Sequence, residues 1–178
     1  NINIAENYWP AEVTGLGEMH LPVVDLLEAY LPNAGVYARQ GFGCGGVVCG
    51  HNIDAWLAPS RRGMTRAAAQ WVGGFGWLAQ HVWEHYAFTV DESFLRDRGM
   101  PIRIAAAEFL LDYSRPDSIT GTIHIGPSGS PENSFMTGLE RSTVDYGISM
   151  DQEIAHELFR NCRTAAEVLG MENDPLIR

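Results

Sequence analysis

The sequence predicts one all-α domain in which helices are joined by long loops and short β pieces. Apolar residues recur at helical spacing through most of the chain, which is the main sign of amphipathic helices. The 178 residues are 46% apolar, which is enough to bury a core. Only a short stretch alternates weakly between apolar and polar side chains, as a strand does. We expect about six helices.

The first half of the chain is expected to hold a helix over residues 16–31, with Pro22 suited to its first turn. Pro32 then permits a second short helix. Residues 41–50 contain five glycines, which is typical of a loop with a short extended piece. Residues 58–66 are expected to form an exposed loop.

The second half is expected to hold three longer helices, over residues 71–88, 101–113 and 151–169. Asp91 is a suitable N-cap for a further helix after the first of these, because its carboxylate can accept from free backbone N–H groups. Gly170 is a suitable C-cap for the last one.

Residues 119–125 alternate as a hairpin strand would, and they lead into a Gly/Pro-rich loop over residues 126–133. Loops of this length in a compact chain are usually functional or disordered. Trp, His, Asn and Gly are frequent in the loops of this chain, which favours a function.

Charge and cysteine content exclude some classes of protein. The chain has 12 Lys and Arg against 22 Asp and Glu, a net charge of −10, which would repel a nucleic-acid backbone. No stretch approaches the ~20 apolar residues that a membrane helix needs, so no membrane insertion is expected. Three cysteines cannot form a complete disulfide framework, although one Cys44–Cys49 bridge is left open.

One motif points to zinc. His81, Glu84 and His85 match H-x-x-E-H on a predicted helix, where the two histidines share a face. A zinc hydrolase also needs a third ligand from another helix, and Trp83 lies between the two histidines. A structural or sugar-lining role is therefore favoured, and no metal is assigned.

Glu132 is the strongest candidate for acid chemistry. It lies in Ser130-Pro131-Glu132-Asn133, a stiff loop of the kind that presents a general acid. The alternative is an ordinary exposed glutamate. Asn1 and Asn3 stand two residues apart, so in an extended segment both amides would face one side and could hold a water.

The segment from His51 to Trp56 also gathers polar groups and an indole. Asp54 could bind sugar hydroxyls while Trp56 stacks on the ring. The alternative is a turn that buries the tryptophan.

Several segments, in order, resemble glycoside hydrolase family 95, the α-1,2-L-fucosidase family. They are Asn1-Ile2-Asn3 through Asn7-Tyr8-Trp9-Pro10-Ala11-Glu12, His51-Asn52-Ile53-Asp54, Gly76-Trp77-Leu78 with His81-Val82-Trp83-Glu84-His85-Tyr86, Ala106-Ala107-Glu108-Phe109-Leu110-Leu111-Asp112, Ser130-Pro131-Glu132-Asn133, and Met150-Asp151-Gln152 with Glu157-Leu158-Phe159. The resemblance implies an (α/α)6 barrel. The chain would supply about six of its twelve helices, as an incomplete catalytic domain over 1–178, truncated at both ends and inactive alone.

The resemblance also implies roles for individual residues. Glu132 would be the general acid, and Asn1 and Asn3 would position the attacking water, assisted by an aspartate in a segment that this chain does not contain. The substrate-binding residues would be His51, Asn52, Asp54, Trp71 and Asn133. The partner would be a fucosylated glycan, with no cofactor and no catalytic metal, at a secreted, periplasmic or cell-surface location.

The expected reaction is release of terminal α-1,2-linked L-fucose with inversion. One alternative is an α-L-galactosidase on the same scaffold. An alternative of another class is a non-catalytic helical module that binds glycan or packs against other domains, and the least favoured alternative is the zinc hydrolase.

Overall fold

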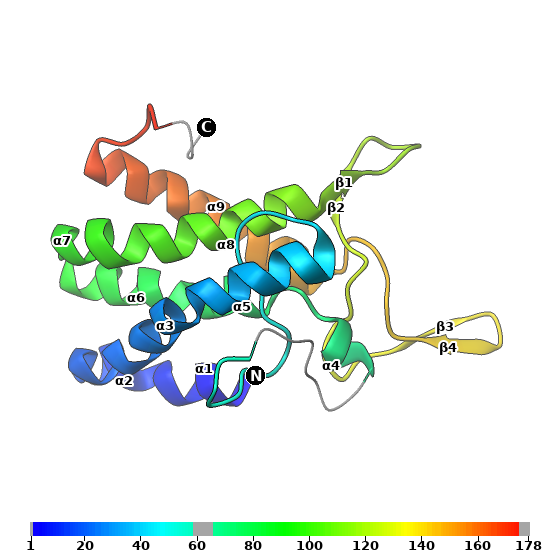
Figure 1. Cartoon of the computed structure of the whole chain (residues 1–178), viewed down its shortest axis with the longest axis horizontal. Coiled ribbons are helices and arrows are strands. Elements are labelled where there is room, and N and C mark those ends of the chain that lie inside the picture. Colours follow the sequence, from blue (N-terminus) through cyan, green and yellow to red (C-terminus); the bar gives the residue numbers. More distant parts are fainter. Residues whose placement is uncertain (1, 59–65, 175–178) are drawn as a thin grey trace.

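The computed structural model describes residues 2–58 and 66–174, and it is mostly helical, which confirms the all-α class. The helices, shown in Figure 1, are α1 (Ile2–Tyr8), α2 (Pro10–Val13), η1 (Gly17–Met19), α3 (Leu21–Tyr37), η2 (Ala38–Phe42), α4 (Arg66–Gln70), α5 (Gly74–Leu78), α6 (Gln80–Thr89), α7 (Glu92–Phe94), η3 (Leu95–Gly99), α8 (Met100–Tyr113) and α9 (Ser149–Leu169). The strands are β1 (Ser114–Pro116), β2 (Ile123–Ile125), β3 (Phe135–Thr137) and β4 (Glu140–Ser142).

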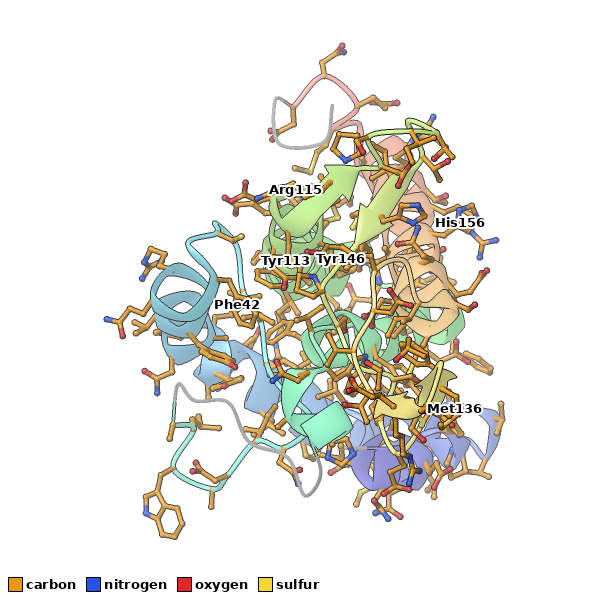
Figure 2. The ribbon with its side chains drawn as sticks, turned by 90° about the vertical axis from the view of Figure 1, so that its right-hand side faces the viewer. Phe42, Tyr113, Arg115, Met136, Tyr146 and His156 are labelled. Carbon is orange, nitrogen blue, oxygen red and sulfur yellow. The ribbon has the colours of Figure 1, made fainter. Side chains whose placement is uncertain are left out.

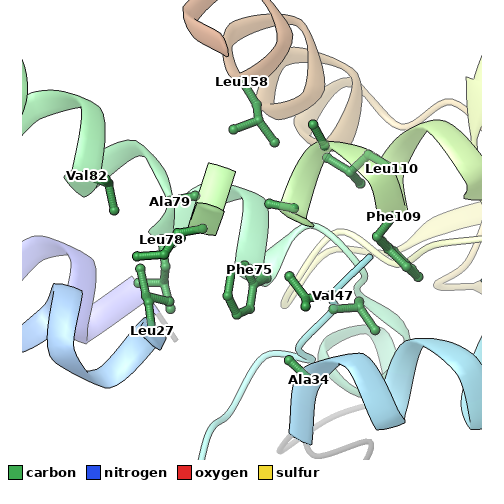
Figure 3. Close-up of a cluster of buried hydrophobic side chains, with 14 of the residues drawn as sticks. Leu27, Ala34, Val47, Phe75, Leu78, Ala79, Val82, Phe109, Leu110 and Leu158 are labelled. Carbon is green, nitrogen blue, oxygen red and sulfur yellow. The ribbon is translucent and has the colours of Figure 1, made fainter. Parts of the chain in front are cut away.

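Helix α8 contacts both α9 and α3, and α5 contacts α8 and α9 (Figure 1). One continuous apolar cluster joins these helices. Figure 3 shows Phe75 of α5 near the middle of this cluster, with Leu158 of α9 above it and Val47 of the glycine-rich loop beside it. All three side chains are buried, so the loop is part of the core rather than an appendage.

Three helix boundaries differ from the prediction. The helix expected from residue 16 begins at Leu21, after the short 3-10 helix η1. Pro32 does not end the first helix, because α3 continues to Tyr37 with Tyr30 and Ala34 buried on either side of the proline. The predicted helix over 71–88 is two helices with a turn at Ala79, and Trp71 precedes both. At this turn the Ala79 carbonyl accepts from the buried Arg103 guanidinium, at 3.2 Å, so a side chain from α8 binds the carbonyl.

The predicted caps and the two helices over 101–113 and 151–169 are confirmed. The Asp91 carboxylate accepts from the N–H groups of Ser93 and Phe94 at the start of α7. Gly170 ends α9 with a left-handed φ of 67°. No described helix has the length and apolar content needed to cross a bilayer.

Both β pieces are antiparallel hairpins that project from the same end of the molecule (Figure 1). The strand predicted over 119–125 is confirmed only in β2, because residues 117–122 form a turn that the Asp117 carboxylate holds through the N–H groups of Ile119 and Thr120. The hairpin of β3 and β4 was not predicted. The Cys44–Cys49 bridge is not formed, and both thiols are free and buried. Most of the loop predicted over 58–66 lies outside the described residues.

Candidate active site

Segments distant in sequence meet at the end of the molecule from which the hairpins project, which faces the viewer in Figure 2. The Val72 N–H donates to the Ser128 hydroxyl oxygen at 3.3 Å. Ser128 and Asp145 exchange two backbone hydrogen bonds, of 2.9 and 3.0 Å. The residues before α5 are thereby attached to the loop that contains Glu132.

Asp151, in the first turn of α9, lies at the centre of this junction and is fully buried. Its Oδ1 accepts from the Trp71 indole N–H at 2.7 Å. A Cβ on Gly73 would stand 2.4 Å from the same oxygen, so only glycine permits this approach. Burial raises the pKa of Asp151 to about 6, although hydrogen bonds from Ser128 and Trp71 oppose the rise.

His51 and Trp71 are brought together, as the resemblance implies, with ring centroids 6.3 Å apart. Both are buried and line one cavity, together with Trp77. The cavity measures about 10 Å³, room for roughly one water and far less than a ligand pocket. The cavity that these described residues line is therefore too small for a sugar.

The neighbouring polar residues form a turn. The Asn52 amide oxygen lies 2.7 Å from His51 Nδ1. Asp54 Oδ1 accepts from the N–H groups of Trp56 and Ala58, at 3.1 and 3.0 Å. The segment thus forms a turn, as one alternative expected, but Trp56 is 85% exposed rather than buried. Its indole remains free to stack on a ligand.

Glu132 is exposed and occupies a strained backbone position. The Asn133 N–H donates to the Ser130 carbonyl at 3.1 Å, closing a turn with Pro131 in the second place. Glu132, in the third place, has a φ of 63°, as in a type II turn that normally uses glycine. Such strain costs of order 1–3 kcal/mol and is concentrated at functional sites. The Asn133 side chain donates to the Ser130 hydroxyl at 2.9 Å and so stiffens the turn.

Asn3 does not lie in the extended segment that was expected, because α1 spans Ile2–Tyr8. Asn3 is exposed, and Asn1 lies outside the described residues.

The zinc motif belongs to a buried hydrogen-bond network instead. His20 Nδ1 and His85 Nδ1 lie 2.8 and 2.7 Å from Glu12 Oε1, and His20 Nε2 lies 2.8 Å from His81 Nδ1. Glu84 is exposed and takes no part. Burial, and then the neighbouring His20, lower the pKa of His81 to about 4.

Within the described residues, Glu12, His20 and His85 are the set whose ligand atoms lie within 4.8 Å of one another. Tetrahedral zinc with ligands at about 2.0–2.1 Å would hold those atoms roughly 3.3 Å apart. The shorter distances fit N–H groups that donate to one carboxylate. The sequence did not reveal this network, because Glu12 and His85 are 73 residues apart.

A cavity of about 670 Å³ opens between α6 and α9. Its lining residues are Trp9, Trp77, Gln80, His81, Glu84, Glu153, Ile154, His156, Glu157 and Arg160. His81 and Glu84 belong to the zinc motif, for which a sugar-lining role was the alternative. The Gln80 amide and His81 Nε2 are buried there without a partner among the described residues.

The chain is similar to known proteins along its whole length. The model of the glycosyl hydrolase family 95 catalytic domain matches residues 1–177. "Alpha-L-fucosidase 2" of Arabidopsis thaliana is 34% identical over 99% of this chain and 21% of its own length. "Probable alpha-fucosidase A" of Aspergillus niger is 28% identical over 89% of this chain and 20% of its own length. The chain thus spans about a fifth of the length of these relatives, and it belongs to glycosyl hydrolase family 95.

Proposed function

We propose that this chain contributes to a glycosidase that releases terminal α-1,2-linked L-fucose from glycans with inversion at the anomeric carbon. The family match and the names of both relatives support a fucosidase. The observation that carries the proposal is Glu132, an exposed carboxyl held at a φ of 63° on a turn stiffened by Asn133.

In the proposed reaction the Glu132 carboxyl gives its proton to the glycosidic oxygen as the bond to the anomeric carbon breaks. A water attacks that carbon from the opposite face, and the inverted sugar leaves with the new hydroxyl. Inverting enzymes separate acid and base by ~6.5–9.5 Å to admit this water. The amides of Asn1 and Asn3 can orient the water but cannot take its proton, so a carboxylate must do so.

We also propose that the chain packs into an (α/α)6 barrel through the face between α6 and α9. The unpartnered Gln80 amide and His81 Nε2 support this, because a buried unsatisfied polar group costs about 1–3 kcal/mol. Trp9, half exposed beside the same cavity, would be covered as well. Polar and aromatic groups from further helices would satisfy both requirements.

Glu132→Gln tests the acid assignment, with Glu140→Gln on exposed β4 as the matched control. Both are measured in a polypeptide with the complete catalytic domain, on 2′-fucosyllactose. We expect kcat to fall ~10²–10⁴-fold for Glu132→Gln with KM nearly unchanged, and no effect of the control. A Glu132→Gln variant within threefold of the unmodified enzyme would refute the assignment.

The stereochemical outcome is tested separately. Proton NMR of the earliest product should show β-L-fucose, because water attacks the face opposite the leaving group. Initial formation of the α anomer would mean a covalent intermediate and would contradict inversion.

A further inference from the structure

We propose that Asp151 is a positioning residue that fixes the loop of Glu132 against the Trp71 segment, an inference that rests on the proposed function. Neither its place in the sequence nor the comparisons assign it a role. Its carboxyl is fully buried at the junction of three segments.

The first connection runs to the segment before α5. Asp151 Oδ1 accepts from the Trp71 indole N–H at 2.7 Å, across 80 residues of sequence. Gly73 allows the carboxylate to come this close, since any side chain there would collide with Oδ1 and with the Trp71 ring. The Trp71 indole and the backbone at Gly73 therefore both lie close to Asp151 Oδ1.

The second connection runs to the loop over residues 126–133, which contains Glu132. Ser128, fully buried, accepts from the N–H of Val72, the residue after the Trp71 that Asp151 holds. Its backbone is paired with Asp145. Ser128 precedes Glu132, the residue with the strained backbone, by four positions.

A carboxylate at this buried position is energetically unfavourable. The second oxygen, Oδ2, is buried with no hydrogen-bond partner among the described residues. A buried ionised group that is only partly satisfied opposes folding, so packing alone does not account for it. An acceptor of this strength is explained if holding the Trp71 indole, next to the Val72 that binds Ser128, orients the acid.

The test compares Asp151→Ala, which removes the acceptor, with Asp151→Asn, which keeps an amide oxygen at the Oδ1 position. Glu140→Gln, on exposed β4, is again the matched control. All are made in a polypeptide with the complete catalytic domain and assayed on 2′-fucosyllactose. A misplaced acid lowers kcat, whereas a merely structural loss lowers the amount of folded enzyme.

Per folded molecule, we expect Asp151→Ala to lower kcat about 10²-fold with KM within threefold, as small misplacements of catalytic groups do. Asp151→Asn should recover most of this loss, and Glu140→Gln should be unchanged. Unaltered kcat in Asp151→Ala, or an Asn variant as impaired as the Ala variant, would overturn the inference.

Hydrogen exchange gives a readout that does not need activity. The backbone N–H groups of Ser128 and Asp145 should exchange at least tenfold faster in Asp151→Ala and at the normal rate in the control. Unchanged exchange would refute the positioning role whatever the substrate. If the enzyme had no fucosidase activity but showed this exchange pattern, the proposed function would be refuted. The role of Asp151 in holding the two segments together would still stand.

Discussion

The pH dependence of stability offers a quantitative test of the buried Asp151 carboxyl. The perturbation is Asp151→Asn, which removes the ionisable group and keeps an acceptor for the Trp71 indole. In the folded protein the pKa of Asp151 is raised from 3.8 to about 6 by burial. At 1.36 kcal/mol per pKa unit, this rise corresponds to about 3 kcal/mol.

The sign follows from proton binding. Between pH 3.8 and about 6 the folded state holds a proton on Asp151 that the unfolded state has lost. The stability of the unmodified protein therefore falls, relative to Asp151→Asn, as the pH rises through this range. About 2 kcal/mol of the difference should appear between pH 4.5 and 7.5, and the curve should be level above pH 7.

Urea unfolding at several pH values in this range measures the effect, with equal m-values as the condition for comparison. Glu140→Gln is again the control, because its exposed carboxylate should give a difference that is nearly flat with pH. A free-energy difference between Asp151→Asn and the unmodified protein that changes by less than about 0.5 kcal/mol would contradict a buried carboxyl with this pKa.

Two further perturbations test other parts of the structure. Because the pKa of His81 is lowered to about 4, the unmodified protein should lose up to about 3 kcal/mol relative to His81→Gln as the pH falls from 6.5 through 4, measured by the same unfolding series. Gly46→Ala should destabilise by about 2–4 kcal/mol in urea at pH 7, since its Cβ would stand 2.4 Å from the Ala105 carbonyl and the Phe109 N–H nitrogen at a φ of 63°. The control is Gly43→Ala, with a similar φ of 69° and nothing within 4 Å, which should cost only about 1–2 kcal/mol. Equal losses of stability in the two variants would show that the contact of Gly46 with α8 is not close.

Local chemistry made several elements predictable. The helices α8 and α9 contain long runs of residues that favour helix. Asp91 caps α7 and Gly170 caps α9 through bonds to residues a few positions away. Glu132 could be recognised as a candidate because its loop composition is itself a local property. The position of this residue at a positive φ is decided by the turn that the folded loop closes.

The wrong predictions depend on tertiary contacts. Pro32 is tolerated inside α3 because core residues on either side hold the helix. The break at Ala79 occurs where Arg103, from another helix, binds the carbonyl.

The amino-acid sequence by itself determined the helical class, the family and the candidate acid, because each depends on residue types and spacings that are already present in the unfolded chain. Only the tertiary structure decided that Asp151 meets Trp71 across 80 residues and that Glu12 binds two histidines of the hydrogen-bond network. Both polar clusters are buried, and burial arises from the packing of segments that have no local sign of being neighbours. The same packing changes the pKa values of Asp151 and His81, since desolvation acts on a side chain only after the surrounding helices have excluded water from it.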